Sequence, residues 1–362
     1  MQLLLEAGSK SRIDPVHIAA MVGDENRGKT LIEDGAEVDQ FPIICTGIPL
    51  YLAVENGHEA VVLVLLEAGA HANGSSKKGT RVLTVASRNG HEAIVRALLE
   101  AGAVVYNATE HEHESPLRAA AVNGHKEILR ALLEVKIEGG TTIESGDDRL
   151  ENNDGNTFTA HKYIQEATRA ACRYGDEEVV RILLRAADVN EDQAHLLYVA
   201  AENGHEGVFD LLMTGANVNH ENSTGATPLF TAARNGHENV VKKLLDAGAT
   251  VDKANVRGTS PLIAAARKGH EAVVRILLEA GADCDLQNND GVTSLWIAAR
   301  NGHITVIEVL LSIGVDKNKA RRDGASPLDA AMRNEISSSE MVIERLRGAG
   351  AVSGILMSKV AW

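Results

Sequence analysis

Residues 23–30 contain the residue types of a phosphate-binding loop, because they read G-x-x-x-x-G-K-T. Such a loop binds a nucleotide when a strand precedes it and its backbone N–H groups surround the phosphates at the start of a helix. The preceding residues 15–22 have the pattern of a helix instead, and Asp24 and Glu25 would repel phosphate. We interpret the match as accidental, with nucleotide hydrolysis at these residues as the alternative.

Other residues that could do chemistry are few. His111 and His113 alternate with glutamates, but two histidines are fewer ligands than a stable zinc site needs. We therefore favour a solvated turn there over a metal site. The sequence has no G-x-S-x-G and no H-E-x-x-H motif, which are signatures of common hydrolase sites. We predict no catalytic residue, no metal, no cofactor and no enzymatic activity.

The most regular charged feature is a series of arginines, each two residues before a recurrent glycine. The exception is Arg333, which keeps the 33-residue period although Glu335 stands in place of the glycine. The series comprises Arg88, Arg173, Arg234, Arg267, Arg300 and Arg333, and the last four are spaced 33 residues apart. The planar guanidinium group suits carboxylates, so the series predicts a basic strip that binds an acidic peptide or protein surface. In the alternative interpretation the arginines are solvated or pair with nearby glutamates.

The elements that position these arginines follow from a repeated motif. A phrase close to N-G-H-E-x-V-V-x-x-L-L-x-x-G-A returns about every 33 residues, a period that predicts stacked units which cannot fold alone. Its histidine appears as His58, His91, His125, His205, His237, His270 and His303. Because these histidines occur once per unit, we expect a structural ladder and not one converging site.

Residues 222–254 indicate how one unit is built. Residues 222–225 have the composition of a turn, and Thr227 and Pro228 suit the N-cap and the first position of a short helix. Gly236 ends that helix, and residues 238–245 form a second helix with its valines and leucines on one face. An extended arm then leads to the next turn.

These residues resemble the ankyrin repeat. The family's opening D-x-x-G-x-T-P-L-H-x-A-A-x-x-G-H is matched at residues 225–237, and in part at residues 258–262 and 323–328. The family's histidine after the Pro-Leu pair is present only at His17. The resemblance implies an all-α fold, an ankyrin-repeat solenoid of stacked helix-turn-helix units with extended hairpin arms. About ten repeats start near residues 15, 46, 79, 113, 164, 193, 225, 258, 291 and 324.

The resemblance also implies that the first helices present the arginine series toward a concave groove. Tyr198 and Trp296 lie near the same groove, where each ring is either an aromatic anchor for a partner or packed between repeats. The expected function is a non-catalytic scaffold that binds a protein or peptide partner, acidic in character, through the groove and the hairpin tips. The alternative is a recognition arm of a larger enzyme or signalling protein whose catalytic domain is absent from this chain.

The repeats are interrupted once, by a segment rich in acidic residues. We expect N-terminal ankyrin repeats over residues 1–134, an acidic insertion over 135–163, C-terminal repeats over 164–350 and a tail over 351–362. Residues 152–157 have the composition of a hairpin turn. We interpret the insertion as a solvated loop, with a partner-contacting loop as the alternative. Residues 1–8 resemble a second helix whose first helix is missing, which favours a chain cut from a longer protein.

Charge and cysteine content limit the classes of binding partner and the cellular compartments that we expect. Residues 1–220 carry 19 Lys and Arg against 34 Asp and Glu, whereas residues 221–362 carry 17 against 16. The acidic half argues against nucleic acid and against anionic membrane surfaces. Three dispersed cysteines suit a reducing compartment, and no stretch reaches the ~20 apolar residues of a membrane span. We expect a monomer in the cytoplasm or the nucleus.

Overall fold

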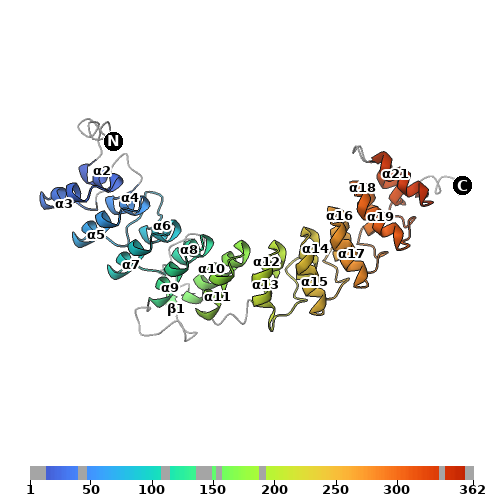
Figure 1. Cartoon of the computed structure of the whole chain (residues 1–362), viewed down its shortest axis with the longest axis horizontal. Coiled ribbons are helices and arrows are strands. Elements are labelled where there is room, and N and C mark those ends of the chain that lie inside the picture. The colour runs from blue at the N-terminus through green and yellow to red at the C-terminus, as the bar shows by residue number, and fades with distance from the viewer. Residues whose placement is uncertain are drawn as a thin grey trace. The chain divides into compact units, whose positions relative to one another are not determined.

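The computed structural model describes residues 14–39, 47–106, 115–135, 149–151, 157–186, 193–333 and 339–354. These residues form ten pairs of α-helices and one short pair of β-strands. The chain divides into two compact units, Met1–Asn190 and Glu191–Trp362, and each contains consecutive helix pairs (Figure 1). The half-repeat predicted at residues 1–8 and the histidines of residues 111–114 lie outside the described residues.

The first unit, Met1–Asn190, stacks its helix pairs in two layers. First helices contact first helices and second helices contact second helices, from one pair to the next. The pairs are α2 (Pro15–Val22) with α3 (Glu25–Glu33), α4 (Pro49–Glu55) with α5 (Glu59–Glu67), α6 (Val82–Asn89) with α7 (Glu92–Glu100), α8 (Pro116–Val122) with α9 (Lys126–Glu134), and α10 (Ala160–Tyr174) with α11 (Glu177–Ala186).

The second unit, Glu191–Trp362, repeats this arrangement. Its first helices again contact one another in order, and so do its second helices. The pairs are α12 (Gln193–Asn203) with α13 (Glu206–Met213), α14 (Pro228–Asn235) with α15 (Glu238–Asp246), α16 (Pro261–Lys268) with α17 (Glu271–Glu279), α18 (Ser294–Asn301) with α19 (Ile304–Ser312), and α20 (Pro327–Met332) with α21 (Ser339–Gly348). The predicted ankyrin-type solenoid of helix pairs is confirmed.

The local structure of α14 and α15 follows the residue pattern of the repeat. The Thr227 side-chain oxygen accepts a hydrogen bond from the backbone N–H of Phe230 at 3.2 Å, and Pro228 occupies the first helical position. Gly236 ends α14 with φ of 84°, a left-handed conformation that glycine adopts without steric cost. α15 then begins at Glu238, where the helix dipole favours a carboxylate.

The core lies between the two helix layers. Alanines such as Ala232 and Ala233 are fully buried in α14, and their small side chains let neighbouring first helices approach closely. Val240, Val241 and Leu244 form the buried face of α15. Full burial of a side chain of this size stabilises the fold by about 1.5–3 kcal/mol, and each repeat obtains that burial only from its neighbours.

The Asn-Gly-His turn links each repeat to the one before it. The histidine Nε2 lies within hydrogen-bond distance of a backbone carbonyl oxygen of the preceding repeat, and because a carbonyl only accepts, Nε2 is the donor. The pairs are His58 with Met21 at 3.1 Å, His125 with Arg88 at 3.1 Å, His237 with Glu202 at 2.9 Å, His270 with Arg234 at 3.1 Å, and His303 with Arg267 at 3.0 Å. These contacts form the ladder expected from the spacing of the histidines.

The asparagine of the same turn adds a second hydrogen bond to this link. The Asn235 side-chain amide donates to the Glu202 carbonyl at 2.7 Å, and Asn301 donates to the Arg267 carbonyl at 2.8 Å. Burial, followed by the charge of neighbouring His125, lowers the pKa of His91 below its ordinary value. A lowered pKa keeps this imidazole neutral near pH 7, with one ring nitrogen free of a proton.

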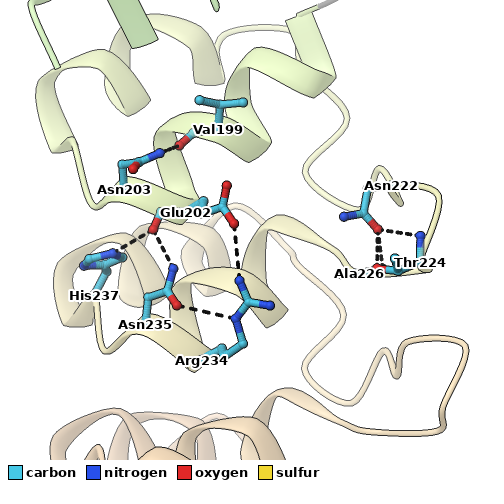
Figure 2. A network of polar contacts seen from close by, with 9 residues as sticks. All are labelled: Val199, Glu202, Asn203, Asn222, Thr224, Ala226, Arg234, Asn235 and His237. Atoms are coloured by element: carbon cyan, nitrogen blue, oxygen red, sulfur yellow. Dashed lines mark hydrogen bonds and ion pairs between the residues drawn. The ribbon is translucent and has the colours of Figure 1, made fainter. Parts of the chain in front are cut away.

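Hairpin arms between repeats form a second ladder. In the second unit the backbone N–H of Val256 donates to the Thr224 carbonyl at 3.0 Å, and the N–H of Asn289 donates to the Arg257 carbonyl at 3.0 Å. Each turn is also closed from within. The Asn222 side-chain oxygen, for example, accepts from the N–H of Thr224 and of Ala226 at 2.9 and 3.1 Å (Figure 2).

The interrupting segment contributes the strand pair. β1 (Arg149–Glu151) and β2 (Thr157–Thr159) pair antiparallel, with Leu150 opposite Phe158, and β2 begins at the last residue of the predicted turn. α10 begins at Ala160, inside the range assigned to the insertion, whereas the division into four ranges stays a prediction. None of the helices among the described residues combines the length and apolar character that crossing a membrane requires.

Candidate functional site

One position of the first helix, which we name the groove position, lies two residues before the turn glycine. In the second unit it holds Glu202, Arg234, Arg267, Arg300 and, at the same period, Arg333. The backbone carbonyls of the first three accept the histidine bonds of the ladder, so the main chain there is fixed. Arg267, Arg300 and Arg333 have exposed side chains. Consecutive first helices are in contact, and packed helices have axes about 8–10 Å apart.

In the first unit the groove position is less uniform. Arg88 near the end of α6 and Arg173 near the end of α10 are both exposed. Between them α8 ends at Val122, and α8 contacts both α6 and α10. The two arginines therefore do not stand on neighbouring helices, and a role for either in partner binding stays a prediction.

Arg234 makes the glutamate pair that was the alternative interpretation of the series. Its guanidinium lies 3.2 Å from a carboxylate oxygen of Glu202 on the preceding first helix (Figure 2). The arginine Nε also donates to the Asn235 side-chain oxygen at 3.4 Å. The two side chains of the ion pair are 40% and 36% exposed, so screening limits the pair to about 0–1 kcal/mol. Arg234 is thus a groove arginine whose charge is met within the chain, and Arg333 likewise has Asp323 at 3.9 Å.

The structure brings Arg267 and Arg300 together in a pocket. A cavity of about 350 Å³ is lined by Arg267 of α16, Arg300 of α18 and Arg321 of the hairpin before α20, with Trp296 and Asp290 among its other lining residues. The guanidinium carbons of Arg300 and Arg321 lie 5.6 and 5.4 Å from the centroid of the Trp296 ring. These are distances at which a cation is attracted to the face of an indole.

Both aromatic rings of the predicted site are buried. Trp296 is 3% exposed, and its indole N–H donates to the backbone carbonyl of Ala325 in the next hairpin at 3.0 Å. Tyr198 is 8% exposed and stacks on His195, with 6.4 Å between ring centroids. The two rings are therefore packed within the array, and Trp296 acts as a wall of the pocket on which two guanidinium groups rest.

Trp296 directly follows the Ser-Leu pair at the start of its helix, and Asp329 occupies the same position of the repeat after Pro-Leu. Asp329 also links its helix to a following segment. There Asp329 accepts hydrogen bonds from the hydroxyl of Ser353 at 2.5 Å and from the N–H of Gly354 at 2.8 Å, and it also caps α20 through Ser326. Burial raises the pKa of the Asp329 carboxyl, but these hydrogen bonds outweigh burial and lower it below its ordinary value. Asp329 and Trp296 each fasten the segment that follows their own helix pair.

Sequence reasoning missed the other two charged residues of the pocket lining, Arg321 and Asp290. Arg321 precedes the turn of residues 322–324 and is not at the groove position, so the 33-residue spacing does not select it. Asp290 belongs to the preceding hairpin. A signal was present in the sequence, because the two preceding hairpins have asparagine at the equivalent position, Asn255 and Asn288, whereas this hairpin has Arg321.

The structure places residues 23–30 in the helical register of the repeat. Gly23 ends α2 with φ of 77°, and the Asp24 side chain caps α3 by accepting from the N–H of Arg27 at 3.0 Å. Gly28 and Lys29 lie inside α3, where Lys29 pairs with Glu25 at 2.5 Å. A helix and not a strand precedes the segment, so the backbone arrangement that a phosphate loop needs is not formed.

Metal-ligating side chains do not converge in the part of the chain that the structure describes. No group of three or more His, Cys, Asp or Glu is placed there so as to hold a metal ion. His111 and His113 fall in residues 107–114, which are outside that part.

Comparison with known families decides the family of the chain. A family model for ankyrin repeats, in sets of three copies, matches residues 50–143, 150–222, 197–288 and 280–348. The chain belongs to the ankyrin-repeat family. A search of curated proteins finds no match to the sequence. Ankyrin repeats generally mediate protein–protein interaction and are typically non-catalytic.

Proposed function

We propose that this ankyrin-repeat chain is a scaffold that binds an acidic protein or peptide across the first-helix face of its second unit. The observation that carries the proposal is the placement of Arg267 and Arg300 on adjacent first helices, with a pocket between them and Arg321. Exposed cations on neighbouring helices reinforce each other, since their separation is close to the Debye length of about 8 Å at physiological salt. Arginine binds carboxylates through two parallel hydrogen bonds.

The backbone ladders support the proposal because they hold the groove position before a partner arrives. The histidine and asparagine of one turn both bond to the Arg267 carbonyl, so the arginine stem starts from a fixed backbone. A pre-ordered surface loses less conformational entropy on binding, which leaves more of the interaction energy as affinity. We further predict a monomer, non-catalytic, in the cytoplasm or the nucleus.

The test is a charge-reversal experiment with a defined peptide. The probe is a fluorescein-labelled 12-residue peptide of alternating Glu and Gly, compared with its Gln and Gly counterpart by fluorescence anisotropy. We expect the wild type to prefer the Glu peptide, and the affinity of that complex to fall as salt is raised. The double variant Arg267→Glu, Arg300→Glu should bind the Glu peptide at least about tenfold more weakly, with thermal unfolding nearly unchanged.

A matched control reverses the same number of charges on the other helix layer. Lys242 of α15 is exposed, and Arg275 of α17 is 54% exposed. The variant Lys242→Glu, Arg275→Glu therefore has the same net charge as the groove variant but leaves the groove position intact. Equal affinity of the wild type and the groove variant, or equal losses in the two double variants, would refute binding at the groove arginines.

A further inference from the structure

We propose that the pocket formed by Arg267, Arg300 and Arg321 seats a phosphorylated side chain of the partner peptide. This inference rests on the proposed function and specifies the chemistry of one group in the ligand. Three separate segments supply the cations, namely α16, α18 and the hairpin before α20. Arginine clusters of this kind bind phosphate through several charge-assisted hydrogen bonds at once.

The charge of the lining favours a dianion over a carboxylate. Three guanidinium groups and the single carboxylate of Asp290 give the lining a formal charge of about +2. A phosphomonoester carries about −1.5 to −2 at pH 7 and offers three acceptor oxygens, so it neutralises the pocket. A Glu or Asp side chain carries one charge and two oxygens, so it offsets only part of the formal charge of the lining.

Contacts with the Trp296 ring hold two of the three guanidinium groups at the pocket. Trp296 is fixed by its bond to the Ala325 carbonyl, and it supports the guanidinium groups of Arg300 and Arg321. An indole face attracts a cation but does not remove its charge or its N–H donors. Arg321 has Asp323 at 3.8 Å, which is beyond the 2.7–2.9 Å of a strong charged hydrogen bond. Among the described residues Arg267 has no ion pair.

The size of the cavity fits one compact group. At about 350 Å³ it is near the lower end of the range for small-molecule pockets. The buried side chains of Val292 and Ile297 also line it, so part of its wall is apolar and fixed in the core.

The chain contains its own optical reporter for the test. Its two tryptophans are Trp296 and Trp362, so the variant Trp362→Phe leaves Trp296, in the pocket wall, as the sole indole. The probe is acetyl-Gly-Gly-phosphoserine-Gly-Gly-amide, with the Glu and Ser peptides of the same length and inorganic phosphate as comparisons. We expect the phosphopeptide to change the Trp296 emission and to bind about tenfold more tightly than the Glu peptide.

Three single variants in the Trp362→Phe background locate the binding. Arg321→Gln should weaken phosphopeptide binding at least about fivefold. Arg275→Gln is the matched control, since Arg275 lies on α17 in the other helix layer, outside the pocket lining, and is paired with Glu271 at 2.9 Å; it should leave the affinity unchanged. Arg267→Gln provides a second pocket variant on a different element, and thermal unfolding of all three confirms that they fold.

Each remaining outcome decides the assignment. A phosphopeptide that binds no more tightly than the Glu peptide overturns it, even if the groove double variant still loses Glu-peptide binding and the proposed function stands. Inorganic phosphate that binds as tightly as the phosphopeptide overturns it in favour of a plain anion site. Loss of affinity in Arg275→Gln equal to that in Arg321→Gln overturns the location.

Discussion

Gly236 is the position where the link between repeats can be tested most directly by one added carbon atom. It ends α14 with φ of +84°, and a Cβ placed there would lie 2.7 Å from Nδ1 of His270, the histidine of the next repeat. Alanine in the left-handed conformation costs about 1–2 kcal/mol. Displacing the His270 ring also breaks its hydrogen bond to the Arg234 carbonyl, which is worth about 0.5–1.5 kcal/mol. Gly236→Ala should therefore destabilise the second unit by about 1.5–3.5 kcal/mol.

The same repeat contains a matched control for the backbone contribution. Gly248 has φ of +82°, and a Cβ there would meet no atom within 4 Å. Gly248→Ala should lose only the conformational term of about 1–2 kcal/mol. The assay is urea unfolding followed by circular dichroism, together with hydrogen exchange of the amides of α14 to α17, because long repeat arrays need not unfold in two states.

A double-mutant cycle isolates the contact itself. In a His270→Ala background the ring that the new Cβ would strike is gone, so Gly236→Ala should cost no more than Gly248→Ala does. Equal losses in the two glycine variants would refute this reasoning, and so would the same cost of Gly236→Ala with and without the His270 ring.

Two further predictions concern charged groups of the second unit. Asp329→Asn should lower the melting temperature at pH 7, since it removes the carboxylate that anchors Ser353 and Gly354. Because the folded pKa of Asp329 is lowered, its carboxylate stabilises the fold above the unfolded pKa of about 3.9, and this stabilisation is lost as pH falls through the folded pKa. A difference in melting temperature between variant and wild type that does not narrow below about pH 4 would contradict this. Glu202→Gln should change unfolding free energy by less than about 1 kcal/mol while strengthening binding of the Glu peptide, because it releases Arg234 from its pair; unchanged peptide affinity would argue that Arg234 lies outside the binding surface.

The fold could be predicted from the sequence because each repeat has its own local signals. The expected N-cap at Thr227, the helix end at Gly236 and the second helix from Glu238 all occur as the residue types indicate. The period then fixes the stacking, since each buried valine and leucine face finds its partner in the next repeat. The early start of α10 at Ala160 was not predictable, because the residues before it do not follow the repeat.

The site was predictable only in part, because spacing along the chain selects positions and not their partners. The 33-residue period identifies Arg267 and Arg300, and the structure places both at one pocket. The period cannot show that Glu202 pairs with Arg234, since that pairing depends on the side-chain conformations of two adjacent helices. Nor does it indicate Arg321, which reaches Trp296 from a hairpin of the following repeat.

The bonds of the Asn-Gly-His turn have a consequence for how such a chain changes over evolutionary time. The histidine hydrogen-bonds to the backbone carbonyl oxygen at the groove position, an atom that all amino acids share. The contact therefore does not depend on which side chain stands there. Methionine, glutamate and arginine accordingly occupy the site at Met21, Glu202 and Arg267 with the same histidine contact. Point substitutions there can change which ligand the surface binds while the hydrogen bonds between repeats remain. Binding specificity and folding stability can therefore change independently in this array.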